Sequence, residues 1–235
     1  MCGRMAVTLP PDAMAQLFAA APDNDLPRVP NYNVCPTNQI HIVTGSEEGG
    51  RRLRGMRWGL IPHWYKKPSD GPLLINARGE TVAEKPAFRK AVRERRAIVV
   101  ATGFYEWTKD EEGGRDPWYI FRRDGAPLAF GAIWQDWKGA EDEVISTCAV
   151  VTIGANKPMQ AIHHRMPVIL EEADWPLWLG EEGKGAATLM RPAADDLLEW
   201  YRVDRAVNSN RAHGEDLLRP LHGEEGEATS AGQGA

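Results

Sequence analysis

Residues 96–102 read RAIVVAT, a run of β-branched and small apolar residues that contains neither glycine nor proline. Such runs are typical of buried β-strands. Runs rich in β-branched and aromatic residues also lie at 118–122, 128–134 and 144–153. Glycine-rich stretches that predict turns between strands lie at 45–50 and 109–116. The chain is therefore predicted to be built mainly on short strands.

Helical patterns are fewer and are irregularly placed among the strands. Spaced apolar residues predict helices at 10–20, 86–96, 171–179 and 193–200. Residues 22–36 are rich in proline and asparagine and predict a long surface loop. Because strands outnumber helices and do not alternate with them, the pattern favours an α+β fold with a mixed, largely antiparallel sheet.

Composition sets broad limits on the class of protein. The chain has 235 residues, of which 43% are hydrophobic and 26% charged, as in a soluble globular protein. It contains no apolar run long enough to span a membrane, and its first residues, MCGRMAVTLPPD, do not resemble a secretory signal. The three cysteines are odd in number and lack metal-site spacing, which favours a reducing, cytoplasmic setting.

The charge is unevenly distributed. The net charge is -5, which by itself argues mildly against a nucleic-acid partner. Residues 51–58 and 88–96 are nonetheless basic, and an acidic protein can still present a basic cleft. Residues 222–235 hold three glutamates and no lysine or arginine, and are predicted to be a disordered acidic, glycine-rich tail.

Cys2 is the most informative single residue. Methionine before a small residue is usually removable, so the mature chain can begin with Cys2. Such a residue carries a thiol and an α-amine with ordinary pKa values of about 8.5 and about 8, so both are partly nucleophilic near neutrality. An amine condenses with an aldehyde to an imine, and the adjacent thiol can close a thiazolidine ring. A cysteine near the start also occurs by chance, so the neighbouring motifs must decide.

Five short motifs occur in order along the chain. They are MCGR at 1–4, MRWGLIPHW at 56–64, INARGET at 75–81, GFYEW at 103–107 and GANKPMQAIHHRMPVIL at 154–170. Together they resemble the SRAP family, the SOS response-associated peptidases. The resemblance covers residues 1–221, nearly the whole chain outside the tail. It implies one domain over 1–221, with a barrel-like β core and a few flanking helices.

The resemblance also implies a function. It implies a DNA-repair protein that loses Met1 and then crosslinks covalently, through Cys2, to abasic sites in single-stranded DNA. Lyase action on abasic DNA and self-processing peptidase action are implied as accompanying activities. The resemblance implies no metal and no organic cofactor. We expect a monomer in the cytoplasm, associated with the nucleoid when bound to DNA.

The family's catalytic residues map onto four positions. The resemblance makes Cys2 the nucleophile, Asn76 the residue that holds the Cys2 amine, and Glu106 the general acid and base. His163 would assist proton transfer, because the pKa of histidine lies near neutrality. Asn76 can alternatively be a turn residue and Glu106 a surface carboxylate. Burial between aromatic neighbours would raise the pKa of Glu106 and suit it to act as an acid.

Four further residues are candidates for DNA binding. Arg4 lies beside the nucleophile in sequence, and Arg78 projects to the same side of an extended segment as Asn76. Both are natural phosphate ligands. Trp64 and Trp107 lie within the motifs and can stack on bases or pack in the protein. Stacking and packing are equally plausible for Trp64, whereas packing is favoured for Trp107.

Two rival functions stay open at this point. A thiol peptidase or amidohydrolase acting on other proteins can also be drawn from Cys2, His163 and Glu106. A non-covalent single-stranded DNA-binding module accounts for the arginines and tryptophans, but not for the four catalytic candidates. Lyase action is only partly a rival, because β-elimination and stable crosslinking share an imine as their first intermediate.

Overall fold

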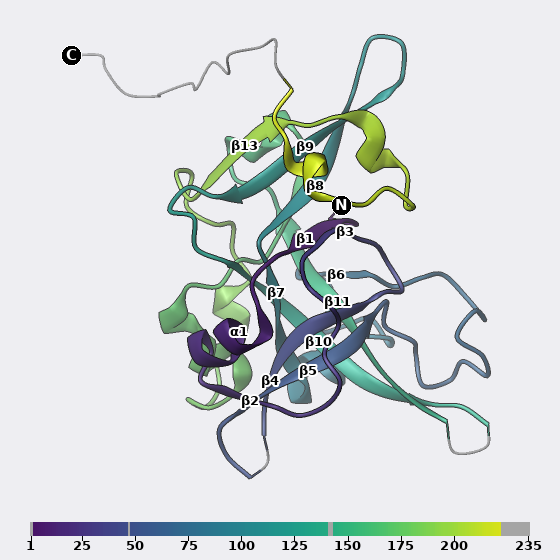
Figure 1. Cartoon of the computed structure of the whole chain (residues 1–235). Coiled ribbons are helices and arrows are strands. Elements are labelled where there is room, and N and C mark those ends of the chain that lie inside the picture. The colour runs from purple at the N-terminus through teal and green to yellow at the C-terminus, as the bar shows by residue number, and fades with distance from the viewer. Residues whose placement is uncertain (1, 47, 141–142, 222–235) are drawn as a thin grey trace.

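The computed structural model describes residues 2–46, 48–140 and 143–221. Two β-sheets carry nearly all of the regular structure, and short helices lie at their edges (Figure 1). This confirms the predicted α+β class. The predicted disorder of residues 222–235 lies outside the described residues.

The larger sheet closes into a five-stranded barrel. Neighbouring strands pair antiparallel in the order β11, β10, β7, β4, β5. The ring closes where β11 and β5 run parallel, at Thr147↔Arg57 and Cys148↔Trp58. The mixed, largely antiparallel character predicted from the sequence is therefore confirmed. The strand bounds are β4 Gln39–Gly45, β5 Arg51–Trp58, β7 Arg96–Ala101, β10 Leu128–Lys138 and β11 Val144–Gly154.

Three short strands extend the barrel at its rim. They are β2 Ala20–Pro22 beside β5, and β6 Asn76–Arg78 and β12 Arg165–Pro167 beside β11. β6 runs parallel to β11, whereas β12 runs antiparallel to it. The rim of the barrel at the end of β11 therefore gathers the segments that carry Asn76 and His163.

The second sheet is antiparallel throughout. Its order is β13-β9-β8-β1-β3, and its strands are β1 Met5–Val7, β3 Asn31–Val34, β8 Gly103–Lys109, β9 Arg115–Arg122 and β13 Leu198–Arg202. The chain leaves the barrel at the end of β7 and enters β8 after a single residue, Thr102. This short connection places the start of the chain, in β1, against the aromatic strand β8 (Figure 1).

The four predicted strand runs and the two predicted turns are confirmed, but the helix predictions fare less well. Helices occur at α1 Pro11–Leu17, α2 Ala91–Glu94 and α3 Trp175–Leu179. The predicted helix at 193–200 is wrong, because its last residues pair with β9 as part of β13. The predicted loop at 22–36 is wrong for Asn31–Val34, which pair with β1. In both cases pairing with a strand distant in sequence overrides local preference.

A buried tryptophan packs against two neighbouring strands of the barrel, β7 and β10. Trp178 of α3 is fully buried, and its indole Nε1 donates to the carbonyl of Ala97 at 2.8 Å. The ring lies directly against Gly131 of β10, where an added Cβ would sit 2.9 Å from Trp178 Cζ2. The absence of a side chain at Gly131 is what lets the indole reach the strand.

Replacing Gly131 with alanine is therefore expected to destabilise the fold by about 1–3 kcal/mol, because the rigid indole must shift. Urea unfolding at neutral pH measures the change. Gly154→Ala is the control, since no described atom lies within 4 Å of a Cβ added there. Equal unfolding free energies for the two variants would contradict the expected packing.

Candidate functional site

Cys2 lies just before β1, pressed against β8. The amide of Tyr105 donates to the carbonyl of Arg4 at 2.9 Å, so the pairing of β1 with β8 continues back toward Cys2. The Cys2 side chain is 1% exposed. Burial raises the pKa of its thiol, and the nearby carboxyl of Glu106 raises that pKa further. The thiol is thus held neutral and close to a carboxyl group.

Glu106 lies in β8 with its side chain 2% exposed. Burial raises the pKa of this carboxyl to about 7, against the smaller opposing effect of Arg115. The alternative of an ordinary surface carboxylate is therefore wrong for Glu106. A carboxyl group with a pKa near neutrality can both donate and accept a proton at physiological pH.

Asn76 reaches Cys2 from the barrel. Its Nδ2 donates to the Cys2 carbonyl oxygen at 2.8 Å. The Asn76 Oδ1 is buried and accepts no hydrogen bond from the described residues. A buried acceptor of this kind requires a donor. The amide therefore fixes the Cys2 backbone and presents an acceptor beside it.

His163 lies between the short 3-10 helix η1, Met159–Ala161, and β12. The amide of Arg165 donates to His163 Nδ1 at 2.9 Å, and burial lowers the pKa of the imidazole. His163 Nδ1 also lies 3.1 Å from the carbonyl oxygen of Arg165, so the main chain of Arg165 holds the orientation of the ring. With its pKa lowered by burial, the ring is mainly neutral at pH 7. The adjacent His164 is exposed and stacks on His163 with ring centroids 4.4 Å apart.

An ion pair joins the segment that carries His163 to the segment that follows β6. The guanidinium of Arg165 binds both carboxylate oxygens of Glu80 at 2.6 and 2.9 Å. It also donates to the Thr152 carbonyl at 2.7 Å, and Thr152 pairs with Arg78 of β6. The structure thus brings Cys2, Asn76 and Glu106 together directly and ties His163 to the same rim.

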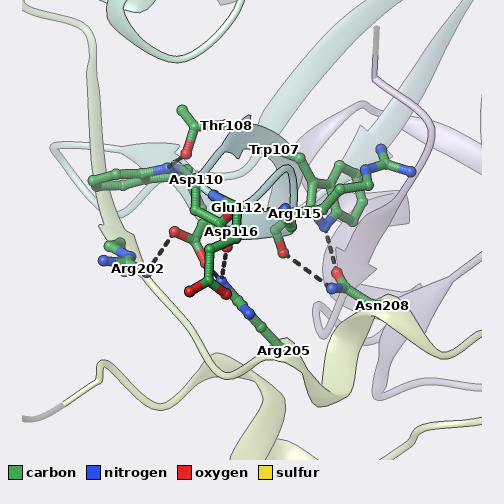
Figure 2. Close-up of polar contacts among 11 residues, drawn as sticks. Trp107, Thr108, Asp110, Glu112, Arg115, Asp116, Arg202, Arg205 and Asn208 are labelled. Carbon is green, nitrogen blue, oxygen red and sulfur yellow. Dashed lines mark hydrogen bonds and ion pairs between the residues drawn. The ribbon is translucent and has the colours of Figure 1, made fainter.

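A hollow opens beside Cys2. It has a volume of about 440 Å³ and is lined by Gly3, Arg4, Pro36, Trp107, Arg115 and Asn208. The Trp107 indole donates from Nε1 to Asn208 Oδ1 at 2.5 Å, and the Asn208 Nδ2 donates to the carbonyl of Arg115 at 3.1 Å (Figure 2). Two of the predicted DNA-binding residues, Arg4 and Trp107, therefore lie in one hollow.

The other two predicted DNA-binding residues lie elsewhere on the surface. Arg78 is exposed in β6, one residue beyond the buried Ala77. Trp64 is 49% exposed and forms edge contacts with His63 and Tyr65. Neither residue lines the hollow. Both present polar or aromatic surface on the barrel side of the molecule.

Three residues of the site were not predicted from the sequence. Asn33, which is 6% exposed, accepts from Arg4 at 2.6 Å and donates to the carbonyls of Ser209 and Ala212. Arg115 and Asn208 line the hollow. None of the three lies in the motifs described above. They meet only because the segment after β13 folds back over β1 and β8.

The described residues contain no group of three metal-ligating side chains. Within the part of the chain that the structure describes, no helix has the length and apolar character needed to cross a membrane.

The model of the SRAP family, SOS response associated peptidase, matches residues 1–210. This chain belongs to the SRAP family, so the resemblance seen in the five motifs is confirmed. Abasic site processing protein YoqW of Bacillus subtilis is 34% identical, over 93% of this chain and 99% of that protein. Abasic site processing protein YedK of Escherichia coli is 31% identical, over 94% and 100% respectively. Abasic site processing protein HMCES of Pongo abelii is 27% identical over 94% of this chain and 76% of its own.

Solved structures carry the same fold. A protein of Bacteroides thetaiotaomicron superposes with a TM-score of 0.81 at 24% identity, covering 94% of this chain and all of that one. A protein of Bordetella bronchiseptica superposes with a TM-score of 0.75 at 25% identity, covering 86% of this chain and 100% of its own.

Proposed function

We propose that this protein processes abasic sites in single-stranded DNA by bonding to them covalently through Cys2. Its relatives in Bacillus subtilis and Escherichia coli bear the name abasic site processing protein. The observation that carries the proposal is the contact of Cys2 with two groups at once. Asn76 binds its carbonyl, and the Glu106 carboxyl, with a pKa of about 7, lies close enough to perturb its thiol.

The proposed reaction begins once Met1 has been removed and Cys2 has a free α-amine. Protonated Glu106 donates its proton to the ring oxygen of the abasic sugar while the C1 hydroxyl loses its proton to solvent, so the bond between C1 and the ring oxygen breaks and the aldehyde forms. The Cys2 amine adds to the aldehyde carbon, and water leaves as the imine forms. The Cys2 sulfur then bonds to the imine carbon while the thiol proton passes to the nitrogen. The product is a thiazolidine, and the net change is the loss of one water.

The order of these steps follows from the pKa of Cys2. Because burial keeps the thiol neutral, the amine is the first nucleophile and the sulfur closes the ring afterwards. Asn76 Oδ1 accepts from the amine and holds it toward the aldehyde. His163 donates a proton to the oxygen that leaves as water.

The DNA strand is proposed to lie over both sheets. Arg78 contacts a phosphate, and Trp64 offers an exposed ring to a base. Arg4 has a more internal role, because its Nη1 donates to Asn33 Oδ1 and to the Val207 carbonyl, both at 2.6 Å. It therefore orders the wall of the hollow on the side of the second sheet.

The test is the intact mass of the protein after incubation with a single-stranded oligonucleotide that carries one abasic site. The expected species is the protein without Met1 plus the oligonucleotide, less one water. A folded, Met1-free protein that forms no adduct would overturn the proposal. Turnover of an added peptide would then favour a peptidase. Equal affinities for undamaged and for abasic DNA would favour a non-covalent binding module.

Asn76→Ala is expected to slow adduct formation by about 10- to 100-fold, because it removes one hydrogen bond to Cys2 and the buried acceptor beside it. Single-turnover gel assays with saturating abasic oligonucleotide measure the rate. Asn38→Ala is the control, since Asn38 caps the Cys35 amide instead. An Asn76 variant as fast as the control would remove Asn76 from the mechanism.

A further inference from the structure

We propose that Arg115 binds the phosphate next to the abasic nucleotide, and that Trp107 and Asn208 position its guanidinium. The inference rests on the proposed function and adds a binding residue that the motifs do not contain. It starts from the hollow beside Cys2, which has arginines, an indole and an amide in its wall.

Arg115 is the positively charged side chain of the hollow that is placed to bind a phosphate. It is exposed at the start of β9, its guanidinium carbon lies 5.0 Å from the centroid of the Trp107 ring, and it forms no ion pair with a described carboxylate. The nearby Arg202 and Arg205 are instead both paired with Asp116 (Figure 2). An arginine stacked on an aromatic ring keeps its N–H edge free for the planar oxygens of a phosphate.

The Asn208 side chain forms two hydrogen bonds that hold Trp107 and the backbone of Arg115 in place. Asn208 accepts from the indole Nε1 of Trp107 and donates to the main-chain carbonyl of Arg115. Asn208 ends the 3-10 helix η4, Arg205–Asn208, and Arg205 fastens this helix to Asp110 and Asp116 of the β8–β9 hairpin. The indole and the backbone beneath the guanidinium are therefore fixed before any ligand arrives.

The hollow lies within reach of one nucleotide from the nucleophile. Gly3 lines the hollow and directly follows Cys2, so the two Cα atoms are about 3.8 Å apart. Arg115 also lies near enough to Glu106 to lower the pKa of that carboxyl. A phosphate held by Arg115 would therefore belong to the lesion or to its neighbour.

The first test uses undamaged single-stranded oligothymidylate, so that it does not depend on covalent capture. Arg115→Gln is expected to weaken binding about tenfold and to flatten the slope of log affinity against log salt by about 0.7. Arg115→Lys should restore the slope but only part of the affinity, because a lysine cannot bind a phosphate bidentately. Arg123→Gln, after the other end of β9, is the control and should behave as the wild type.

The second test separates binding from chemistry on an abasic oligonucleotide at pH 6, where Glu106 stays largely protonated in both proteins. Arg115→Gln should raise the half-saturating concentration about tenfold and leave the saturated adduct rate within about threefold. Asn208→Ala should weaken binding in the wild type and have little further effect in Arg115→Gln.

The outcomes distinguish this inference from the proposed function. If Arg115→Gln binds oligothymidylate like Arg123→Gln, Arg115 is not a phosphate ligand, although adducts through Cys2 can still form. If the wild type forms no adduct but Arg115→Gln lowers the salt slope, the proposed function fails and the phosphate site stands. A wild type that does not bind oligothymidylate would overturn the phosphate site, whereas the adduct assay alone decides the proposed function. Equal effects of Asn208→Ala in both backgrounds would remove its positioning role.

Discussion

Cys2→Ala is expected to form no covalent adduct with abasic single-stranded DNA, while it still binds the undamaged strand. Alanine at the N-terminus keeps an α-amine and can form an imine, but it has no sulfur to close the ring. The imine is reversible, so the product should be lost on denaturation or should decay by β-elimination. Intact mass after acid quenching is the measurement, and a persistent adduct at the wild-type yield would contradict the thiazolidine.

The matched control for this variant is Cys35→Ala. Cys35 is half-buried and precedes Pro36 of the hollow, so it tests whether any nearby thiol suffices. We expect Cys35→Ala to form the adduct at the wild-type yield. Cys2→Ser adds a second comparison, because a hydroxyl occupies the site of the sulfur but is a far weaker nucleophile.

Glu106→Gln is expected to slow adduct formation by about 100-fold or more, because an amide cannot donate an acidic proton to the opening sugar. The pKa of Glu106 is about 7, so its acid form predominates below pH 7. The wild-type rate should therefore lose an acid-dependent component as pH rises above 7, and the variant should lack this component. The measurement is the initial rate of adduct formation between pH 5.5 and 8.5 for the wild type and for Glu106→Gln. A wild-type profile with no acid-dependent component would exclude Glu106 as the acid.

The same substitution is expected to stabilise the protein at high pH. The pKa of Glu106 is raised from 4.5 to about 7 in the folded state. The folded state therefore binds the Glu106 proton more tightly than the unfolded state does. The contribution of this carboxyl to stability is complete below pH 4.5 and is lost as the pH rises through 7. A shift of this size corresponds to about 3 kcal/mol. The free energy of unfolding of Glu106→Gln should thus be about 3 kcal/mol higher than that of the wild type at pH 8, and similar to it near pH 4.5.

An exposed carboxylate controls for the loss of one charge. Glu111→Gln, in the turn after β8, should unfold like the wild type at both pH values. A Glu106 variant that is no more stable at pH 8 than at pH 4.5 would contradict the burial argument. Opposite effects on rate and stability are typical of a group held in a strained environment for function.

Much of the candidate site could be predicted because its reactive residues lie within short sequence motifs. Cys2, Asn76 and Glu106 each fall in a motif, and the structure brings all three into contact. The residues that support them could not be predicted in this way. Asn33 and Asn208 lie 175 residues apart. Asn208 lines the hollow and Asn33 binds Arg4 in its wall, and they come together only because strands distant in sequence pair there.

Trp107 illustrates the same limit. The sequence places it beside Glu106 and favours packing over base stacking, without naming the groups it packs against. The structure sets two guanidinium groups over its ring, those of Arg4 at 5.8 Å and Arg115 at 5.0 Å, and ties its nitrogen to Asn208. These neighbours come from segments distant in sequence, so no local pattern could reveal them.

The sequence by itself determined the strand runs, the turns at 45–50 and 109–116, the family and the chemistry available to Cys2. These properties depend on side-chain type and short-range order, which local sequence encodes. Only the tertiary structure decided that residues 198–200 form a strand, that Glu106 is buried, and that Arg115 faces the hollow. These depend on long-range strand pairing, because burial and charge environment are set by the segments that pack against a residue and not by its neighbours in the chain.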